Sequence, residues 1–202
     1  MHQSSYDKMT SFKEKYLSEK FNERLKIYDI GSGDVNGTYK PIFNESSWDY
    51  IGIDTAKGKN VDIVINDPYC WKQIESNSAD VVISGQAFEH IEYPWLTILE
   101  IKRILKPGGI CCLIAPGGGP DHKYPVDCWR FHPDGFIALA KWTKLSVMEV
   151  YAQWDNKNYS DGSDIWQDCV LICKKDNYDN LVKIKEFLVD RMLRCSLKLV
   201  TF

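Results

Sequence analysis

A short apolar strand, a glycine-rich turn and a distant acid most constrain what this chain can fold into. Residues 27–30 (Ile-Tyr-Asp-Ile) run directly into Gly31-Ser32-Gly33, and Asp54 ends the next apolar run, 50–53. An acid about 20 residues after such a turn is typical of an α/β unit that holds a nucleotide where its strands end. The sequence therefore predicts a parallel sheet with a ligand site at that edge.

Two acids beside the glycine turn narrow the class of ligand. Asp29 lies in the strand, and Asp34 follows the turn. A loop that holds a pyrophosphate uses backbone N–H groups and a helix N-terminus, which favour negative charge, so two carboxylates would repel a dinucleotide. They suit a ligand with an amine and a positive charge next to its adenosine, which is S-adenosylmethionine. A nicotinamide-dependent oxidoreductase shares the outline but is disfavoured by these acids and by Asn36, where the dinucleotide pattern has glycine.

The composition excludes several other classes of protein. The 202 residues are 44% hydrophobic and 26% charged, with a net charge of −3, which argues against disorder and against a basic nucleic-acid binder. No apolar run approaches the roughly 20 residues that cross a bilayer, and residues 1–5 lack the profile of a secretory signal. The seven cysteines follow no disulfide spacing and indicate a reduced protein. We expect one cytoplasmic domain over residues 1–202, monomeric or homodimeric, that binds no nucleic acid and has no membrane span.

The order of apolar patterns predicts an α/β sandwich. Helices are expected within 1–25, over 94–105, from about 132 to 140, and over 178–202; strands are expected at 27–30, 50–53, 61–65, 80–84, 109–115, 146–152 and 168–174. Strands that alternate with helices favour a mostly parallel, seven-stranded sheet between two helical layers. The last two strands lack an intervening helix and are expected to form a C-terminal β-hairpin. Only about seven positions separate Asp54 from Val61, too few for a parallel crossover, so the helix expected there must be missing or reduced to a turn.

From about Ile27 to Leu145 the chain resembles the class I S-adenosylmethionine-dependent methyltransferases, and in particular the small methyltransferase type 11 proteins of bacterial glycan and surface-polysaccharide biosynthesis. The resemblance implies a Rossmann-like methyltransferase sandwich with S-adenosyl-L-methionine as cofactor. It rests on four segments in the expected order: Asp29-Ile30-Gly31-Ser32-Gly33, Asp54, Asn66-Asp67 and Ser84-Gly85-Gln86, followed by the turn Leu105-Lys106-Pro107-Gly108-Gly109.

The family assigns a role to each of these segments. It implies that Gly31, Ser32 and Gly33 approach the methionine part of the cofactor beside Asp29. Asp54 would hold both ribose hydroxyls, since a carboxylate accepts two donors together. Asp67 would receive the adenine amine, and Ser84, Gly85 and Gln86 would lie against the methionine moiety. The turn departs from the family pattern because the next glycine, Gly37, comes later than the usual third glycine.

His90, in the segment that follows the fourth strand, is the expected general base. Methyl transfer from a sulfonium chiefly requires alignment of acceptor, methyl and sulfur, and a base is needed only when the acceptor must lose a proton. The ordinary pKa of histidine, near 6.5, suits proton removal at neutral pH. The alternative is that Glu89-His90 only caps the following helix or lines the pocket.

A loop over residues 116–132, rich in glycine, proline and polar groups, follows the fifth strand. Its polar and aromatic groups are of the kind that orient a hydroxylated ligand. The expected substrate-binding residues are His122, Tyr124, Asp127, Trp129 and Arg130. His122, Asp127 and His132 offer side chains that can bind a metal, as do the cysteines, but we expect no metal site.

The sequence thus predicts an S-adenosylmethionine-dependent methyltransferase that acts on a small-molecule acceptor. The resemblance alone points to a sugar or glycan precursor, because a fold does not fix a function. The alternative is a catalytically silent module that binds S-adenosylmethionine for regulation.

Overall fold

The computed structural model describes residues 2–177, 188–189 and 191–192, and these residues build a seven-stranded sheet. The strands are β1 (Leu25–Ile30), β2 (Trp48–Asp54), β3 (Ile63–Val64), β4 (Ala79–Gly85), β5 (Leu105–Ala115), β6 (Ser146–Ala152) and β7 (Cys169–Lys174). Their order across the sheet is β3-β2-β1-β4-β5-β7-β6. The first five are parallel, and β7 runs antiparallel to β5 and β6. The mostly parallel sheet and its C-terminal hairpin are confirmed.

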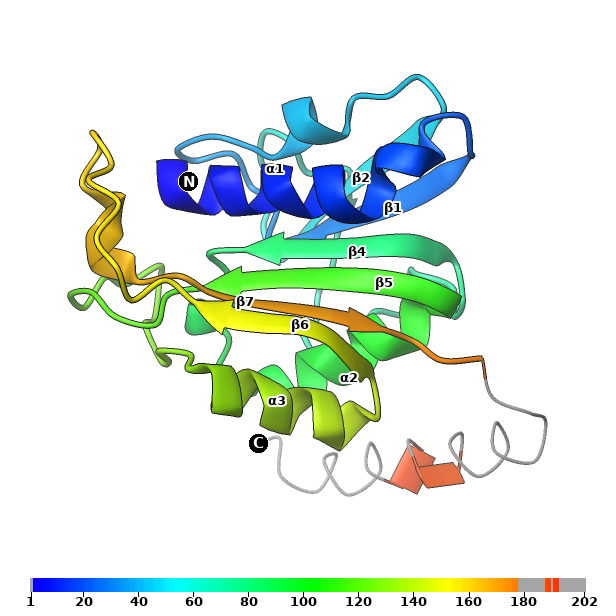
Figure 1. Cartoon of the computed structure of the whole chain (residues 1–202). Coiled ribbons are helices and arrows are strands. Elements are labelled where there is room, and N and C mark those ends of the chain that lie inside the picture. Colours follow the sequence, from blue (N-terminus) through cyan, green and yellow to red (C-terminus); the bar gives the residue numbers. More distant parts are fainter. Residues whose placement is uncertain (1, 178–187, 190, 193–202) are drawn as a thin grey trace.

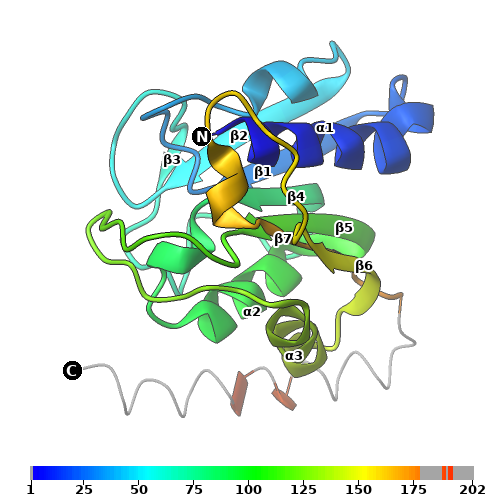
Figure 2. The same ribbon diagram turned by 60° about the vertical axis from the view of Figure 1, so that its left-hand side comes forward.

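Helices cover both faces of this sheet (Figure 1). Helix α1 (Gln3–Leu17) lies on one face, and α2 (Pro94–Ile104) and α3 (Pro133–Thr143) lie on the other. The turned view in Figure 2 shows the same three layers. Four single-turn helices fill connections: η1 (Ser18–Lys20), η2 (Lys40–Phe43), η3 (Phe88–His90) and η4 (Ser163–Trp166). Among the described helices, none combines the length and the hydrophobicity that crossing a membrane requires.

Alternate residues of the central strands supply the two halves of the core. Cys111 and Leu113 of β5 face the layer of α2 and α3, whereas Cys112 and Ile114 face the layer of α1. All four side chains are at most 1% exposed. A strand buried on both faces reads as a continuous apolar run, which is why this strand was readily predicted. Cys111, Cys112, Cys169 and Cys173 are buried free thiols, and free cysteine commonly packs in a core as a small apolar residue.

Several elements differ in extent from the sequence prediction. Helix α1 ends at Leu17 because the chain must reach Leu25, which begins β1 and pairs with Trp48. Strand β5 begins at Leu105, predicted to be helical, because Leu105 pairs with Ala79; the register then shifts so that residues 106–109 lie opposite a single residue of β4.

The edge strand β3 is only two residues long. Asp62, just before it, bonds to Gly52 with its carboxylate (2.8 Å) as well as with its own N–H (2.9 Å), so its side chain replaces part of the ladder. No helix lies in the connection between β2 and β3, whose residues are all described, as its short length predicted. The helix predicted over 178–202 lies almost wholly outside the described residues.

Candidate functional site

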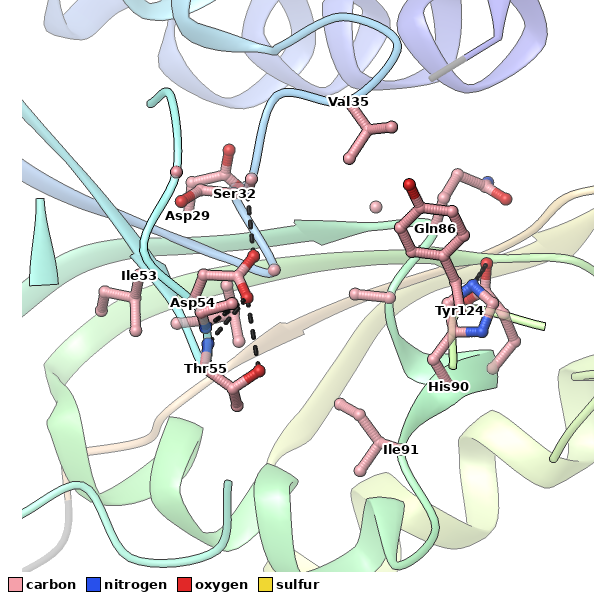
Figure 3. Close-up of a pocket in the computed structure, with 18 of the residues that line it drawn as sticks. Asp29, Ser32, Val35, Ile53, Asp54, Thr55, Gln86, His90, Ile91 and Tyr124 are labelled. Atoms are coloured by element: carbon pink, nitrogen blue, oxygen red, sulfur yellow. Dashed lines mark hydrogen bonds and ion pairs between the residues drawn. The ribbon is translucent and has the colours of Figure 1, made fainter. Parts of the chain in front are cut away.

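The parallel strands end around a cavity of about 1170 Å³. Its walls come from the turn after β1, the end of β2, the segment after β4 and the loop after β5. In Figure 3, Asp29, Ser32 and Asp54 lie on one side of this cavity, and His90 and Tyr124 lie on the other. Open α/β sheets bind ligands at this edge, beside the point where the strand order reverses. Here that point lies between β1 and β4.

The turn after β1 requires glycine. Gly31 has a φ of +76°, and a Cβ at this position would lie 2.5 Å from the Cβ of Ala87. Both the backbone conformation and the close approach of the segment after β4 therefore exclude a side chain. The N–H groups of Gly31 and Ser32 donate to the carbonyl of Ile53 at 2.9 and 3.1 Å. The turn is thus fixed between β2 and β4.

Asp54 ends β2 and presents its carboxylate to the cavity (Figure 3). Its Oδ2 accepts a hydrogen bond from the N–H of Gly33 at 2.9 Å, and its Oδ1 accepts from the N–H groups of Thr55 at 2.7 Å and Ala56 at 3.3 Å. Backbone donors therefore orient the side chain. Because a carboxylate oxygen accepts two hydrogen bonds, Oδ2 retains a lone pair for a donor in the cavity.

Asp29 is a buried carboxyl group beside the glycine turn. It is 2% exposed, lines the cavity and accepts a hydrogen bond from the hydroxyl of Tyr50. Burial raises the pKa of Asp29 to about 7, while the hydrogen bond from Tyr50 opposes that shift. A positive charge brought to this carboxyl would favour its ionised form. Asp29 is therefore suited to a cationic ligand group.

Asp34 was expected to favour a cationic ligand, but its carboxylate contacts other residues of the protein. Its carboxylate pairs with the ammonium of Lys59 at 2.6 Å and accepts from the N–H of Gly37 at 2.9 Å. These contacts lower the pKa of Asp34, with the Lys59 hydrogen bond as the largest cause. Gly37, whose role the sequence left open, closes the lengthened loop on Asp34. The negative charge available to a ligand comes mainly from Asp29 and Asp54.

The segment after β4 forms the floor of the cavity. A Cβ on Gly85 would lie 1.9 Å from the hydroxyl of the buried Tyr39, so glycine is required there. Gln86 has a φ of +58°, and its side-chain amide donates to Ser5 at 3.2 Å and to Asp168 at 3.0 Å. Gly85 and Gln86 line the cavity. Ser84 is fully buried and instead donates to the carbonyl of Ile30 at 2.8 Å.

Asp67 is exposed and accepts a hydrogen bond from the N–H of Tyr69 at 2.8 Å. Its neighbours Ile65 and Pro68 line the cavity, whereas Asp67 does not. Ile53 and Ile65 line the cavity next to Asp54 and form an apolar wall there; the N–H of Ile65 donates to the carbonyl of Asp54 at 2.9 Å. In Figure 3, Ile53 lies beside Asp54, whereas Ile91 lies on the side of His90. This wall suits a flat apolar group such as a nucleobase.

Glu89 and His90 follow on the short helix η3. The Glu89 side chain is fully buried, and neither of its carboxylate oxygens has a hydrogen-bond partner among the described residues. Burial raises the pKa of Glu89 to about 8. Nδ1 of His90 lies 2.6 Å from the carbonyl oxygen of Val126, which can only accept, so Nδ1 carries the hydrogen and Nε2 is left with a lone pair. Desolvation lowers the pKa of His90, which favours this neutral form.

The loop of residues 116–132, called here the acceptor loop, folds over η3. The backbone N–H groups of Cys128 and Trp129 donate to the carbonyl of Glu89 at 2.7 and 3.3 Å. This places the His122 ring 5.0 Å from that of His90, centroid to centroid, and the Tyr124 ring 6.4 Å from it. His122 and Tyr124 both line the cavity.

The other three predicted substrate residues hold the acceptor loop in place. Arg130 donates to both oxygens of Asp127, at 2.6 and 2.7 Å, and this contact lowers the pKa of Asp127 well below its usual range. The indole N–H of Trp129 donates to the carbonyl of Ile91 at 3.0 Å. Asp127, Trp129 and Arg130 do not line the cavity.

The structure brings most of the predicted residues into one site. The cavity is lined by Asp29, Gly31, Ser32, Gly33, Asp54, Gly85, Gln86, His90, His122 and Tyr124. Sequence reasoning missed the apolar wall and named Glu89 only as a residue that caps the following helix or lines the pocket, without a chemical role of its own. A glutamate within the apolar run Ala-Phe-Glu-His-Ile was a usable signal, because buried acids are rare without a partner.

Comparison with known proteins matches the central part of the chain to one family model. Residues 28–113 match the family model described as a methyltransferase domain. No curated protein matches the sequence significantly.

Three solved structures share the fold at low identity. The CurJ carbon methyltransferase is 15% identical, with a TM-score of 0.60 over 83% of this chain and 54% of the other. A 1,6-didemethyltoxoflavin-N1-methyltransferase of Burkholderia thailandensis, solved with S-adenosylhomocysteine, is 11% identical, with a TM-score of 0.64 over 86% and 79%. Phosphoethanolamine N-methyltransferase 2 of Haemonchus contortus, solved with S-adenosyl-L-methionine, is 18% identical, with a TM-score of 0.57 over 76% and 49%. The chain therefore spans about half of the first and third of these proteins.

Proposed function

We infer that this chain transfers the methyl group of S-adenosylmethionine to a small-molecule acceptor. Two findings support this inference: residues 28–113 match a methyltransferase domain, and the fold is that of the class I methyltransferases. One observation carries the inference. The glycine turn and Asp54 end neighbouring strands on a cavity that continues to His90 and His122. The cavity thus has two walls. The first, at the glycine turn and Asp54, suits a nucleoside, and the second, the polar wall at His90, His122 and Tyr124, suits a separate acceptor.

The residues at the first wall fit S-adenosylmethionine. Oδ2 of Asp54 keeps a lone pair for a ribose hydroxyl, and the apolar wall at Ile53 and Ile65 suits adenine. Asp29 is buried with an elevated pKa and would be stabilised as a carboxylate by the ammonium of the cofactor. Gly31 and Gly85 leave no space for a Cβ, so the backbone itself forms the surface beside the methionine part. When bound, the cofactor supplies an electrophilic methyl group on a positively charged sulfur.

At the other wall, this chain positions the acceptor and receives its proton where one must leave. Alignment of the reacting atoms accounts for most of the acceleration in such a displacement. Nε2 of His90 is the ring nitrogen with a free lone pair and is therefore the atom that can accept a proton. Tyr124 and His122 offer hydrogen bonds to a hydroxylated acceptor. In this proposal the acceptor is a sugar or glycan precursor.

The proposed location, oligomeric state and partners of the protein rest on the sequence alone. The protein is cytoplasmic, works as a monomer or homodimer and does not bind nucleic acid; its net charge of −3 supports the last point. The described residues give no specific support to a silent, cofactor-binding module.

Calorimetry with S-adenosylmethionine tests the cofactor site. We expect tight binding that Asp54→Ala weakens, while Asp49→Ala, an exposed acid on the same strand, leaves it unchanged. Equal affinity in both variants, or stronger binding of NAD than of S-adenosylmethionine, would contradict the proposal. Incubation with labelled cofactor and a panel of sugars and cell extracts, followed by mass spectrometry, identifies the acceptor. Single-turnover transfer by His90→Ala then tests the base, since an unchanged rate at every pH excludes it.

A further inference from the structure

Three side chains at the polar wall of the cavity point their ligand atoms at one another. Oε1 of Glu89 lies 3.6 Å from Nε2 of His90 and 3.9 Å from Nε2 of His122. The three ligand atoms all lie within 4.8 Å of one another. Ligands held at 2.0–2.1 Å from one tetrahedral ion are roughly 3.4 Å apart. The two distances from Glu89 are therefore close to those around a shared metal ion, and a small movement of the histidine rings would bring the third pair to the same spacing.

The second ring nitrogen of each histidine faces an oxygen atom. Nδ1 of His90 donates to the carbonyl of Val126 at 2.6 Å. Nδ1 of His122 lies 3.3 Å from Oδ2 of Asp127, although the pair does not have the geometry of a hydrogen bond. Metal-binding histidines usually give their second nitrogen to a carbonyl or a carboxylate, as His90 does, which fixes the tautomer and directs the free lone pair at the ion. Asp127 is itself held by both terminal nitrogens of Arg130.

Glu89 supplies an independent reason to expect a ligand. Its side chain is fully buried, yet both oxygens are without a hydrogen-bond partner in the described part of the chain. Buried polar groups are normally satisfied, and a buried carboxylate requires a partner or an ion. The two terminal nitrogens of the nearby Arg130 guanidinium donate to Asp127, and its Nε makes no hydrogen bond to Glu89.

We propose that Glu89, His90 and His122 bind a divalent first-row transition-metal ion at the acceptor side of the cavity. Two imidazoles and one carboxylate favour zinc or iron(II) over magnesium and calcium, which prefer oxygen ligands. Three protein ligands leave positions open for an exogenous oxygen, as in catalytic metal sites. The sequence-based expectation of no metal considered His122 with Asp127 and His132; the structure instead groups His122 with η3 and places Asp127 behind it.

The role of the ion, unlike its binding, rests on the proposed methyl transfer. An acceptor hydroxyl that coordinates the ion loses its proton to water, because a bound cation lowers the pKa of a coordinated hydroxyl. A lone pair of that oxygen forms the new C–O bond while the C–S bond breaks, and its electron pair stays on sulfur. S-adenosylhomocysteine and the methyl ether result. The same lone pair of His90 Nε2 serves the two proposals differently: it binds the ion where the ion is present, and it accepts the acceptor's proton where the ion is absent.

Cobalt(II) titration of the chelator-treated full chain tests the site, because cobalt absorption reports both the ligand type and the coordination number. We expect one ion per chain with nitrogen and oxygen ligands, displaced by zinc and not by excess magnesium. His122→Ala and Glu89→Gln should weaken binding about 100-fold or more. Asp127→Asn, which removes no ligand, should weaken it about 10–100-fold. His132→Ala is the matched control and should leave it unchanged.

Three results would overturn the proposal. One is cobalt affinity in Glu89→Gln and Asp127→Asn equal to that of the native chain. Another is thiolate-to-cobalt absorption, which would place the ion on a cysteine such as the exposed Cys128. S-adenosylmethionine binding by the same variants shows that they are folded. The third is native protein that binds S-adenosylmethionine but not cobalt, which would refute the ion alone. Native protein that binds cobalt but not S-adenosylmethionine would refute only the proposed methyl donor.

Discussion

Replacing Asp29 by asparagine should make the ligand-free protein more stable at neutral and alkaline pH. The native carboxyl is 2% exposed, and burial raises its pKa from 3.8 to about 7. Below pH 3.8 it is protonated in the folded and unfolded states alike and contributes no difference. Between pH 3.8 and 7 the unfolded chain releases the proton while the folded chain retains it, so the free energy of unfolding falls as pH rises.

The magnitude follows from the size of this shift. One pKa unit corresponds to about 1.4 kcal/mol, so a rise from 3.8 to about 7 costs the native protein about 4 kcal/mol above pH 7. Asparagine has the same shape and no charge, so Asp29→Asn avoids this cost. Asp29→Asn also replaces the carboxylate that accepts a hydrogen bond from Tyr50. This replacement adds a constant to the difference in unfolding free energy between the variant and the native chain, and does not change how that difference depends on pH between 4 and 8.

Urea unfolding of the native chain, Asp29→Asn and the control Asp49→Asn, at half-unit steps from pH 4 to 8, measures the effect. The difference in unfolding free energy between Asp29→Asn and the native chain should grow by up to about 4 kcal/mol across this range. The exposed control should follow the native curve. Parallel curves for Asp29→Asn and the native protein would refute the reasoning. The same variant should bind S-adenosylmethionine about tenfold more weakly at pH 8, because the ammonium loses its buried partner.

Three other substitutions test the frame of the site. Gly52→Ala places a Cβ 1.9 Å from the carbonyl of Asn60 and should cost about 1–3 kcal/mol in urea unfolding, whereas Gly58→Ala, with no atom closer than 3.9 Å, should have little effect. Asp54→Ala should lower the calorimetric affinity for S-adenosylmethionine more than Asp67→Ala, because Asp67 does not line the cavity. A larger loss in Asp67→Ala would show instead that Asp67 binds adenine, as the family resemblance implies. Arg130→Met removes the two bonds that hold Asp127 and should speed tryptic cleavage after Lys123; an unchanged rate would show that the acceptor loop does not depend on that pair.

Features that depend on neighbours in sequence were predictable. The strand that ends at Ile30, the glycine turn and the acid at Asp54 each follow from a local pattern. Their meeting follows from the rule that parallel strands end at one edge of a sheet. The missing helix after β2 was also predictable, because the length of a connection is read directly from the sequence.

Features that depend on the path of a loop were not predictable. Oε1 of Glu89 lies 3.9 Å from Nε2 of His122 because the backbone N–H groups of Cys128 and Trp129 donate hydrogen bonds to Glu89 and hold the acceptor loop against η3. The partner of Asp34 is Lys59, from a different loop. Side-chain pairings of this kind leave no periodic signal, and the sequence therefore assigned Asp34 to the ligand.

Main-chain hydrogen bonds hold both ends of the acceptor loop. Besides its bonds to Glu89, the N–H of Phe131 donates to the carbonyl of Pro116, and Gly117 and Gly118 donate to that of Trp166. Such anchors tolerate a change of side chain anywhere along the tip, from His122 to Val126. Evolution, or a mutant library confined to those few positions, can therefore exchange one acceptor for another while the methyl-donor half of the protein is inherited unchanged.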